Sequence, residues 1–291
     1  MTDGVFVVDK PGGCTSHDMV ARLRKHLGTR AVGHAGTLDP MATGVLLLLV
    51  GEATKLSSYL TLETKTYRAE VRFGLETDSL DVDGKTLREV NVPPEKLAEV
   101  AILGALRDER ARTHQQPPAV SAIQIGGVRA HRLVRQGVVP ALEPRPVRVE
   151  RLELLATREG HVELEVTASK GYYVRALARD LGERLGVPAC LSALRRLESG
   201  GFKLEEAWPW PLGPNATPLS VVAVARRCLP PAELAVDGAR RARLGQALTP
   251  EHFLGAAPAE GPAAWLEHEE LVAVGALRDD AYRVLRGFGP R

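Results

Sequence analysis

Gly33-His34-Ala35-Gly36-Thr37-Leu38-Asp39-Pro40-Met41-Ala42-Thr43-Gly44 leads directly into six consecutive apolar residues, 45–50. A continuous apolar run of strand length is typical of a strand that is covered on both faces, so we expect 45–50 to be central in a sheet. The loop before this strand carries one carboxylate, Asp39. Its glycines permit unusual backbone angles and close approach of a substrate, while Pro40 stiffens the chain beside the acid.

Asp39 has two interpretations on this evidence. An isolated aspartate in a loop rich in glycine and threonine most often serves only the turn itself. A carboxylate delivered to the start of a central strand is also well placed to act as a nucleophile. The composition of the loop leaves both interpretations open.

The chain before the loop predicts a strand over 4–9 and a helix over 17–27. Thr15 and Asp18 fit a capping box at the start of this helix, and Gly28 suits the position just after its end. The helix also places its apolar residues on one face.

The chain after the loop predicts a mixed α/β fold. In 66–73 apolar and polar residues alternate, which indicates a half-buried strand with Tyr67 on its inward side. The further expected elements are a helix over 94–106, a long irregular stretch over 113–127, strands over 147–156 and 161–168, and a helix over 174–185. Long irregular stretches in compact domains are often functional.

The length of 291 residues suits one large domain and one small one, because domains usually contain about 100–200 residues. Beyond Trp208-Pro209-Trp210-Pro211 the composition shifts toward Ala, Pro and Gly. We expect a first domain over 1–230, with an excursion over 110–135, and a second domain over 231–291.

Composition excludes several classes of protein. With 44% hydrophobic and 25% charged residues the chain should form a packed core. The net charge of +2 does not by itself indicate a nucleic-acid partner, although arginines gather in short clusters that would permit a basic stripe. The N-terminal residues lack the pattern of a leader and no apolar run approaches the roughly 20 residues of a membrane helix, so a cytoplasmic location is expected.

No metal site is predicted. The three cysteines are widely separated without a Cys-x-x-Cys pair, so neither a zinc site nor a disulfide framework is indicated. Asp81-Val82-Asp83-Gly84 superficially suggests a calcium loop, but an EF-hand register would place Val90 at the twelfth position, where a glutamate is needed. We expect a polar turn there.

The loop quoted above, followed by Gly51-Glu52-Ala53-Thr54-Lys55, resembles the signature of the TruB-type tRNA pseudouridine-55 synthases almost letter for letter. Further blocks resemble the same family in the same order: Asp9-Lys10-Pro11-Gly12, Lys65-Thr66-Tyr67-Arg68, Ser169-Lys170-Gly171-Tyr172-Tyr173-Val174-Arg175 and Leu194-Arg195-Arg196. The resemblance covers about the first 200 residues. The tail is less specifically similar to the small PUA RNA-binding domain of that family.

The resemblance implies a largely antiparallel catalytic sheet, a β-rich PUA-like C-terminal domain and a reaction that needs no metal or cofactor. Pseudouridylation breaks the bond between base and ribose, turns the base and rejoins it through carbon. By resemblance Asp39 supplies the required anion, by attack on the sugar or through the glycal route, and Arg175 pairs with it. Without the motif, Arg175 would be interpreted as a solvated surface residue.

The resemblance also assigns residues to the substrate pocket. Tyr67 matches the catalytic tyrosine of the family, which would stack on the target base and could take the proton from carbon 5. We favour stacking over proton transfer because a phenol is a weak base at neutral pH. Tyr173 and Leu194 would line the uracil pocket, and His34 would help to extrude the uridine. Tyr67, Tyr173 and Leu194 would also suit a core. A histidine five residues before an aspartate would also suit a metal site or a catalytic dyad, but the sequence shows no companion ligand cluster for His34.

Lys10 and Pro11 are interpreted as structural support for the catalytic loop. The implied partner is the T-arm stem-loop of tRNA, bound by a monomer without an obligatory protein partner. One departure from the family pattern falls in the excursion, where Pro117-Pro118-Ala119-Val120-Ser121-Ala122-Ile123-Gln124 lacks the usual Tyr and Lys.

Three alternatives remain at this point. The protein could act mainly as an RNA-folding helper, or could belong to the guide-RNA-dependent branch of the same superfamily. A phosphotransferase that uses Asp39 would be a different class, but no second aspartate follows two residues later to hold magnesium.

Overall fold

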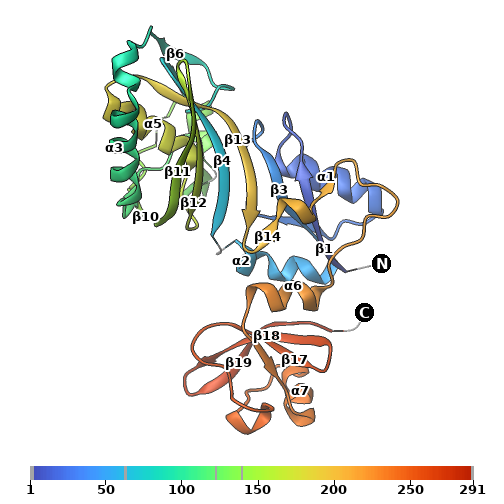
Figure 1. Cartoon of the computed structure of the whole chain (residues 1–291). Coiled ribbons are helices and arrows are strands. Elements are labelled where there is room, and N and C mark those ends of the chain that lie inside the picture. Colours follow the sequence, from blue (N-terminus) through green and yellow to red (C-terminus); the bar gives the residue numbers. More distant parts are fainter. Residues whose placement is uncertain (1–2, 62–63, 122, 139, 290–291) are drawn as a thin grey trace.

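The computed structural model describes residues 3–61, 64–121, 123–138 and 140–289. Ala122, in the predicted excursion, lies outside the described residues. Figure 1 shows a large sheet with helices beside it, and a smaller β-rich unit at the C-terminal end of the chain. The predicted mixed α/β class is confirmed.

One sheet contains nine of the described strands, in the order β11-β12-β4-β13-β3-β1-β15, with β2 on β3 and β14 on β13. In that order the strands are β11 (Val149–Arg158), β12 (His161–Ala168), β4 (Lys65–Phe73), β13 (Ala189–Ser199), β3 (Thr43–Val50), β1 (Gly4–Lys10), β15 (Trp208–Pro209), β2 (Val32–Ala35) and β14 (Phe202–Lys203). The pairs β13–β3 and β1–β15 are parallel, and the other pairs are antiparallel. The expected largely antiparallel sheet is therefore present.

Strand β3 is central, as its apolar run predicts. It pairs with β1 and β2 and also meets β13 at Thr43 and Gly44. Its residues 44–50 are all buried, because alternate side chains enter two different clusters on the two faces of the sheet. The end of the glycine-rich loop therefore lies where β3 meets β13, in the middle of the strand order.

Helices α1 (Ser16–Leu27) and α5 (Val174–Leu185) have the predicted ends. Thr15 caps α1 in a capping box with Asp18, and Gly28 ends it in the left-handed region at φ 65°. Local signals in the sequence fix both ends of α1, which is why its bounds were predictable.

The predicted helix over 94–106 is two elements. A short 3₁₀ turn, η2 (Pro94–Leu97), ends at Ala98, whose ψ of 138° breaks the helix, and α3 (Glu99–Arg110) follows. The prediction missed this break because Ala98 is a good helix former and carries no local signal.

The excursion contains short strands rather than only irregular chain. β7 (His114–Gln115) pairs with β10 (Arg145–Pro146), and β8 (Gln124–Ile125) pairs with β9 (Val128–Arg129), before α4 (Ala130–Arg135). A separate pair, β5 (Leu75–Thr77) with β6 (Thr86–Glu89), flanks the turn that contains Asp81. The remaining helical elements are η1 (Gly51–Leu56), α2 (Ser57–Leu60), η3 (Leu204–Glu206), α6 (Val221–Cys228), α7 (Val236–Arg243) and η4 (Pro250–His252).

A second sheet has the order β16-β17-β18-β19. Its strands are β16 (Pro231–Glu233), β17 (Ala263–Glu267), β18 (Glu270–Arg278) and β19 (Ala281–Gly287). One buried cluster contains side chains from both sheets, among them Val7 and Leu47 from the first and Leu266 and Val274 from the second. The two sheets are thus joined by apolar packing.

Candidate active site

Two buried cations hold the loop that carries Asp39. Lys10, at the end of β1, is fully buried, and its Nζ donates to the carbonyl oxygens of Ala42 (2.7 Å), Pro11 (2.8 Å) and Pro40 (3.3 Å). Burial lowers the pKa of Lys10, and the nearby Asp39 carboxylate partly opposes that shift. Lys10 therefore lies directly against the loop, and its Nζ links the carbonyl of Pro11 to those of Pro40 and Ala42.

Arg196 holds the loop from the other side. Its side chain is buried, and it donates to the carbonyl oxygens of Val45 (2.7 Å) and Gly36 (2.8 Å). Gly44 has a φ of 99°, and a Cβ there would overlap the main-chain oxygen of Arg196. The last glycine of the signature is therefore required by close packing against Arg196. Arg196 belongs to one of the blocks that resemble the family, but the sequence alone indicated no role for it.

Arg175, in the first turn of α5, holds Asp39 with two hydrogen bonds. Nε donates to Oδ2 at 2.9 Å and an Nη donates to Oδ1 at 3.1 Å. The guanidinium also donates to the main-chain oxygens of Ser79 (2.7 Å) and Val120 (3.0 Å). The Arg175 side chain is 6% exposed and that of Asp39 is 33% exposed, so the arginine is fixed while the carboxylate remains accessible to a substrate.

Asp81 is a member of this site that sequence reasoning missed. Its Oδ2 lies 3.6 Å from Nε of Arg175, and its side chain is only 7% exposed. Burial raises the pKa of Asp81, although hydrogen bonding from Ser79 and the charge of Arg175 oppose the shift. The turn was predicted to be an ordinary polar one, but Val82 donates its N–H to Leu191 of β13, which draws the turn into the protein.

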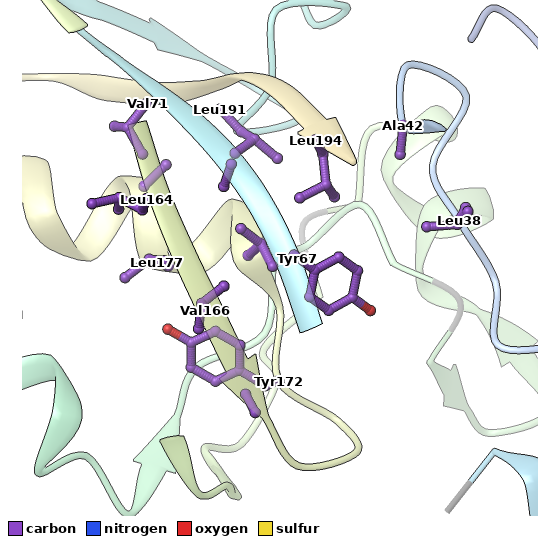
Figure 2. Packing of buried hydrophobic residues seen from close by; sticks show 14 of the residues in the cluster. Leu38, Ala42, Tyr67, Val71, Leu164, Val166, Tyr172, Leu177, Leu191 and Leu194 are labelled. Atoms are coloured by element: carbon purple, nitrogen blue, oxygen red, sulfur yellow. The ribbon is translucent and has the colours of Figure 1, made fainter. Parts of the chain in front are cut away.

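Tyr67 and Leu194 come from neighbouring strands and form an apolar wall. Tyr67 on β4 is 9% exposed and Leu194 on β13 is 8% exposed, in one cluster with Leu38 and Ala42 of the loop. Figure 2 shows the Tyr67 ring below Leu194, on the side toward the loop. The predicted inward face of β4 is confirmed, and the structure brings these two residues together.

Tyr173 immediately precedes α5. Its backbone N–H donates to Oε1 of Gln115 at 2.8 Å, and its carbonyl accepts from Nε2 of Gln115 at 3.2 Å. Burial raises the pKa of the Tyr173 phenol. Since Arg175 follows two residues later, Tyr173 and Arg175 are positioned by the same turn of chain.

His34 lies on β2, with its ring 5.3 Å from that of His17, centroid to centroid, in an edge-on arrangement. Burial lowers the pKa of His34 to about 4, and the charges of His17, Arg196 and Arg129 add to this shift. The imidazole is therefore neutral near pH 7. Its Nδ1 is buried without a hydrogen-bond partner among the described residues.

A cleft of about 400 Å³ lies beside Leu194. Met41 and Thr43, from the glycine-rich loop and the start of β3, line one part of it, and Arg68 and Glu163 bring charge to its wall. The described part of the chain contains no group of three or more His, Cys, Asp or Glu residues that could hold a metal ion. No helix among the described residues is both long and apolar enough to span a membrane.

The model of the TruB family pseudouridylate synthase N-terminal domain matches residues 24–174. A tRNA pseudouridine synthase B from Mycobacterium tuberculosis (strain ATCC 25618 / H37Rv) is 48% identical over 208 residues, which is 70% of this chain and 69% of that protein. The protein of the same name from Mycobacterium sp. (strain KMS) is 43% identical over 270 residues, 89% of each.

Solved structures share the fold. A chain in a Cbf5-Nop10-Gar1 complex gives a TM-score of 0.76 at 25% identity, covering 99% of this chain and 85% of that chain. A chain in an H/ACA RNP bound to a substrate RNA containing 2′-deoxyuridine gives 0.72 at 23% identity, covering 99% of this chain and 86% of that chain.

Fold and sequence together define an RNA-modifying isomerase of the pseudouridine synthase class, which converts uridine in RNA into pseudouridine. The chain belongs to the TruB family of pseudouridylate synthases. The family resemblance seen in the sequence is thereby confirmed.

Proposed function

We propose that this chain makes pseudouridine in tRNA, at the T-arm uridine of position 55, with Asp39 as the catalytic carboxylate. The observation that carries the assignment of Asp39 is its pairing with Arg175 through two hydrogen bonds at 2.9 and 3.1 Å. The curated relatives that match the chain are named tRNA pseudouridine synthase B, which supports tRNA as the substrate.

The reaction needs an anion in a fixed position. The N1–C1′ bond of uridine breaks, the base turns, and C5 bonds to C1′ while the C5 proton leaves and N1 gains a proton. Asp39 either attacks C1′ or acts along the glycal route. In both routes Arg175 orients the carboxylate, and burial of the guanidinium limits its competing contacts with water.

Asp39 follows Leu38, whose side chain shares a buried cluster with Tyr67 and Leu194, so apolar walls for a flat base lie next to the carboxylate. In the proposal Tyr67 stacks on the uracil, and Leu194 and Tyr173 line the remaining walls. Neutral His34 helps to displace the uridine from the T-loop, because an imidazole without charge can occupy a partly apolar space at low desolvation cost. Unstacking the base costs a few kcal/mol, which the pocket contacts must offset.

RNA contacts beyond the pocket are assigned to two regions. Residues 110–135 would contact the T-arm, and residues 231–291 would form a PUA-like RNA-binding domain. Recognition should rest on the shape of the T-arm, its phosphates and the flipped base, because side chains read A-form grooves poorly. We propose a monomer that acts without a guide RNA.

The test is tritium release from a tRNA transcript labelled at carbon 5 of its uridines, followed by mapping of the modified position. Wild type should release tritium at the T-loop uridine with no added protein or guide RNA. Asp39→Asn should release none while it still binds tRNA, and Asp108→Asn, at a 57% exposed side chain of α3, should match wild type.

Three other results would each contradict a part of the proposed function. Turnover by Asp39→Asn would remove Asp39 from catalysis. Tight binding of tRNA without release by wild type would favour the RNA-folding helper. Release mapped to another uridine would overturn the assignment to position 55.

A further inference from the structure

Gln115 makes an unusual pair of contacts. Its side chain is 1% exposed, and its amide binds both the N–H and the carbonyl of Tyr173, as one strand would bind another. The two residues are 58 positions apart in the chain. A buried amide that satisfies both main-chain groups of one residue fixes that residue's orientation.

Gln115 is itself held firmly. It lies on β7, where it pairs with Arg145 of β10, and Thr113 accepts a hydrogen bond from the N–H of Val147. The next residue, Gln116, accepts a hydrogen bond from Arg179 on α5 through its carbonyl. Residues 113–116 are therefore held in a fixed position beside the start of α5.

The main chain of Tyr173 has few other contacts that fix its orientation. It is the N-cap residue of α5, has extended backbone angles, and makes no side-chain capping bond. Two residues earlier, Gly171 has a φ of 84° with open space around it, so the chain there has little to restrict it. The neighbouring Tyr172 is fixed separately, because its hydroxyl donates to Glu109 at 3.0 Å.

We propose that Gln115 is a positioning residue for Tyr173, and that it sets the orientation of the phenol ring against the flipped uracil. The proposal rests on the proposed function only in taking Tyr173 as a wall of the base pocket. Without the amide, the main chain of Tyr173 rotates and the base is held in a wider range of orientations. The chemical step should suffer more than tRNA binding does.

The experiment uses the full chain with a T-arm stem-loop transcript under single-turnover conditions. Gln115→Met keeps the side-chain length and removes both hydrogen bonds, whereas Gln115→Glu keeps the acceptor and removes only the donor. We expect the rate of the chemical step to fall about tenfold in Gln115→Met, the usual size for an unsatisfied buried group, with the Kd for the transcript within about twofold.

Two controls separate positioning from general damage. Gln136→Met makes the same substitution at an exposed glutamine outside residues 110–135, and should retain the wild-type rate. In a Tyr173→Ala background Gln115→Met should cause no further loss, because the ring that it positions is gone. An additive loss, or a wild-type rate in Gln115→Met, would overturn the proposal.

A readout independent of activity keeps the inference testable if the proposed function fails. In protein labelled with 3-fluorotyrosine, the ¹⁹F resonance lost in Tyr173→Phe identifies Tyr173 among the five tyrosines. That resonance should shift or broaden in Gln115→Glu, while the resonance of Tyr282 in the second sheet stays in place. An unchanged Tyr173 resonance in a folded Gln115→Glu protein would contradict the inference, whatever the activity.

Discussion

Arg175 has more acceptors than it needs to hold one carboxylate. Its guanidinium reaches Asp39, two main-chain oxygens and, at 3.6 Å, the buried Asp81. The three nitrogens of the guanidinium point in different directions, so a forked side chain can reach these acceptors together and an ammonium cannot. Because these acceptors satisfy the guanidinium, the arginine can be buried there without a large desolvation cost.

Arg175→Lys should therefore reduce the single-turnover rate about a hundredfold, because two charge-assisted hydrogen bonds are lost and the ammonium cannot reproduce the fork. Binding of tRNA should change little. Arg107→Lys, at an 81% exposed side chain on α3, is the matched control. A rate near that of wild type for Arg175→Lys would count against the ion-pair arrangement.

His34 predicts a dependence of stability on pH. Its folded-state pKa of about 4 lies below the ordinary value of 6.5, so between these values the unfolded chain binds a proton that the folded protein does not. Stability is therefore lost as the pH falls from 6.5 toward 4, on the order of 1–2 kcal/mol after allowance for partial exposure.

The His34→Gln protein should lack this loss. Urea unfolding of both proteins at pH 7.5 and pH 4.5 measures the loss. Between these two pH values the free energy of unfolding should fall less in the variant than in the wild type. Parallel changes in the two proteins would show that His34 does not cause the dependence.

At the scale of elements, the glycine-rich loop has its shape because Lys10 of β1 and Arg196 of β13 both bind its carbonyl groups. Gly44→Ala should lower the free energy of unfolding by about 2–4 kcal/mol, since a Cβ there meets the Arg196 main chain at a positive φ. Gly12→Ala is the control, because its Cβ would lie 3.5 Å from the Met41 oxygen, an ordinary contact. Thermal unfolding of both variants measures this, and equal stabilities would refute the packing argument.

The sequence predicted elements with local signals and missed contacts made by distant residues. Helix α1 was predictable because capping signals lie at both of its ends, and α5 because its apolar residues recur on one face. Asp81 and Gln115 looked like ordinary turn and loop residues, since only the approach of β13 and of α5 buries them. The roles proposed for Asp39 and its neighbours rest on the family signature, because loop composition alone did not separate a catalytic acid from a turn.

At the scale of the whole molecule, the cluster shared by the two sheets predicts that they unfold together. Phe288 follows β19, is 7% exposed, and belongs to the same cluster as Val7 and Leu47 of the first sheet. The composition shift near 230 suggested a domain boundary but gave no sign of this apolar contact.

Phe288→Ala should lower the free energy of unfolding by about 3 kcal/mol, the usual cost of such a cavity, and leave a single unfolding transition. Leu254→Ala, at a 65% exposed side chain, should have almost no effect. Calorimetry distinguishes the outcomes, because two separate transitions in the wild type would show that the units unfold independently.

Arg196 also constrains the order in which the protein is built during synthesis. The loop from Gly36 onward is translated early, but the guanidinium that fixes it belongs to a residue 160 positions later, 196 minus 36. At about 5–20 residues per second a ribosome needs roughly 8–32 seconds to cover that interval. The nascent chain therefore carries Asp39 long before Arg196 is available to hold its loop. A product truncated before Arg196 would leave the Gly36 carbonyl without this donor.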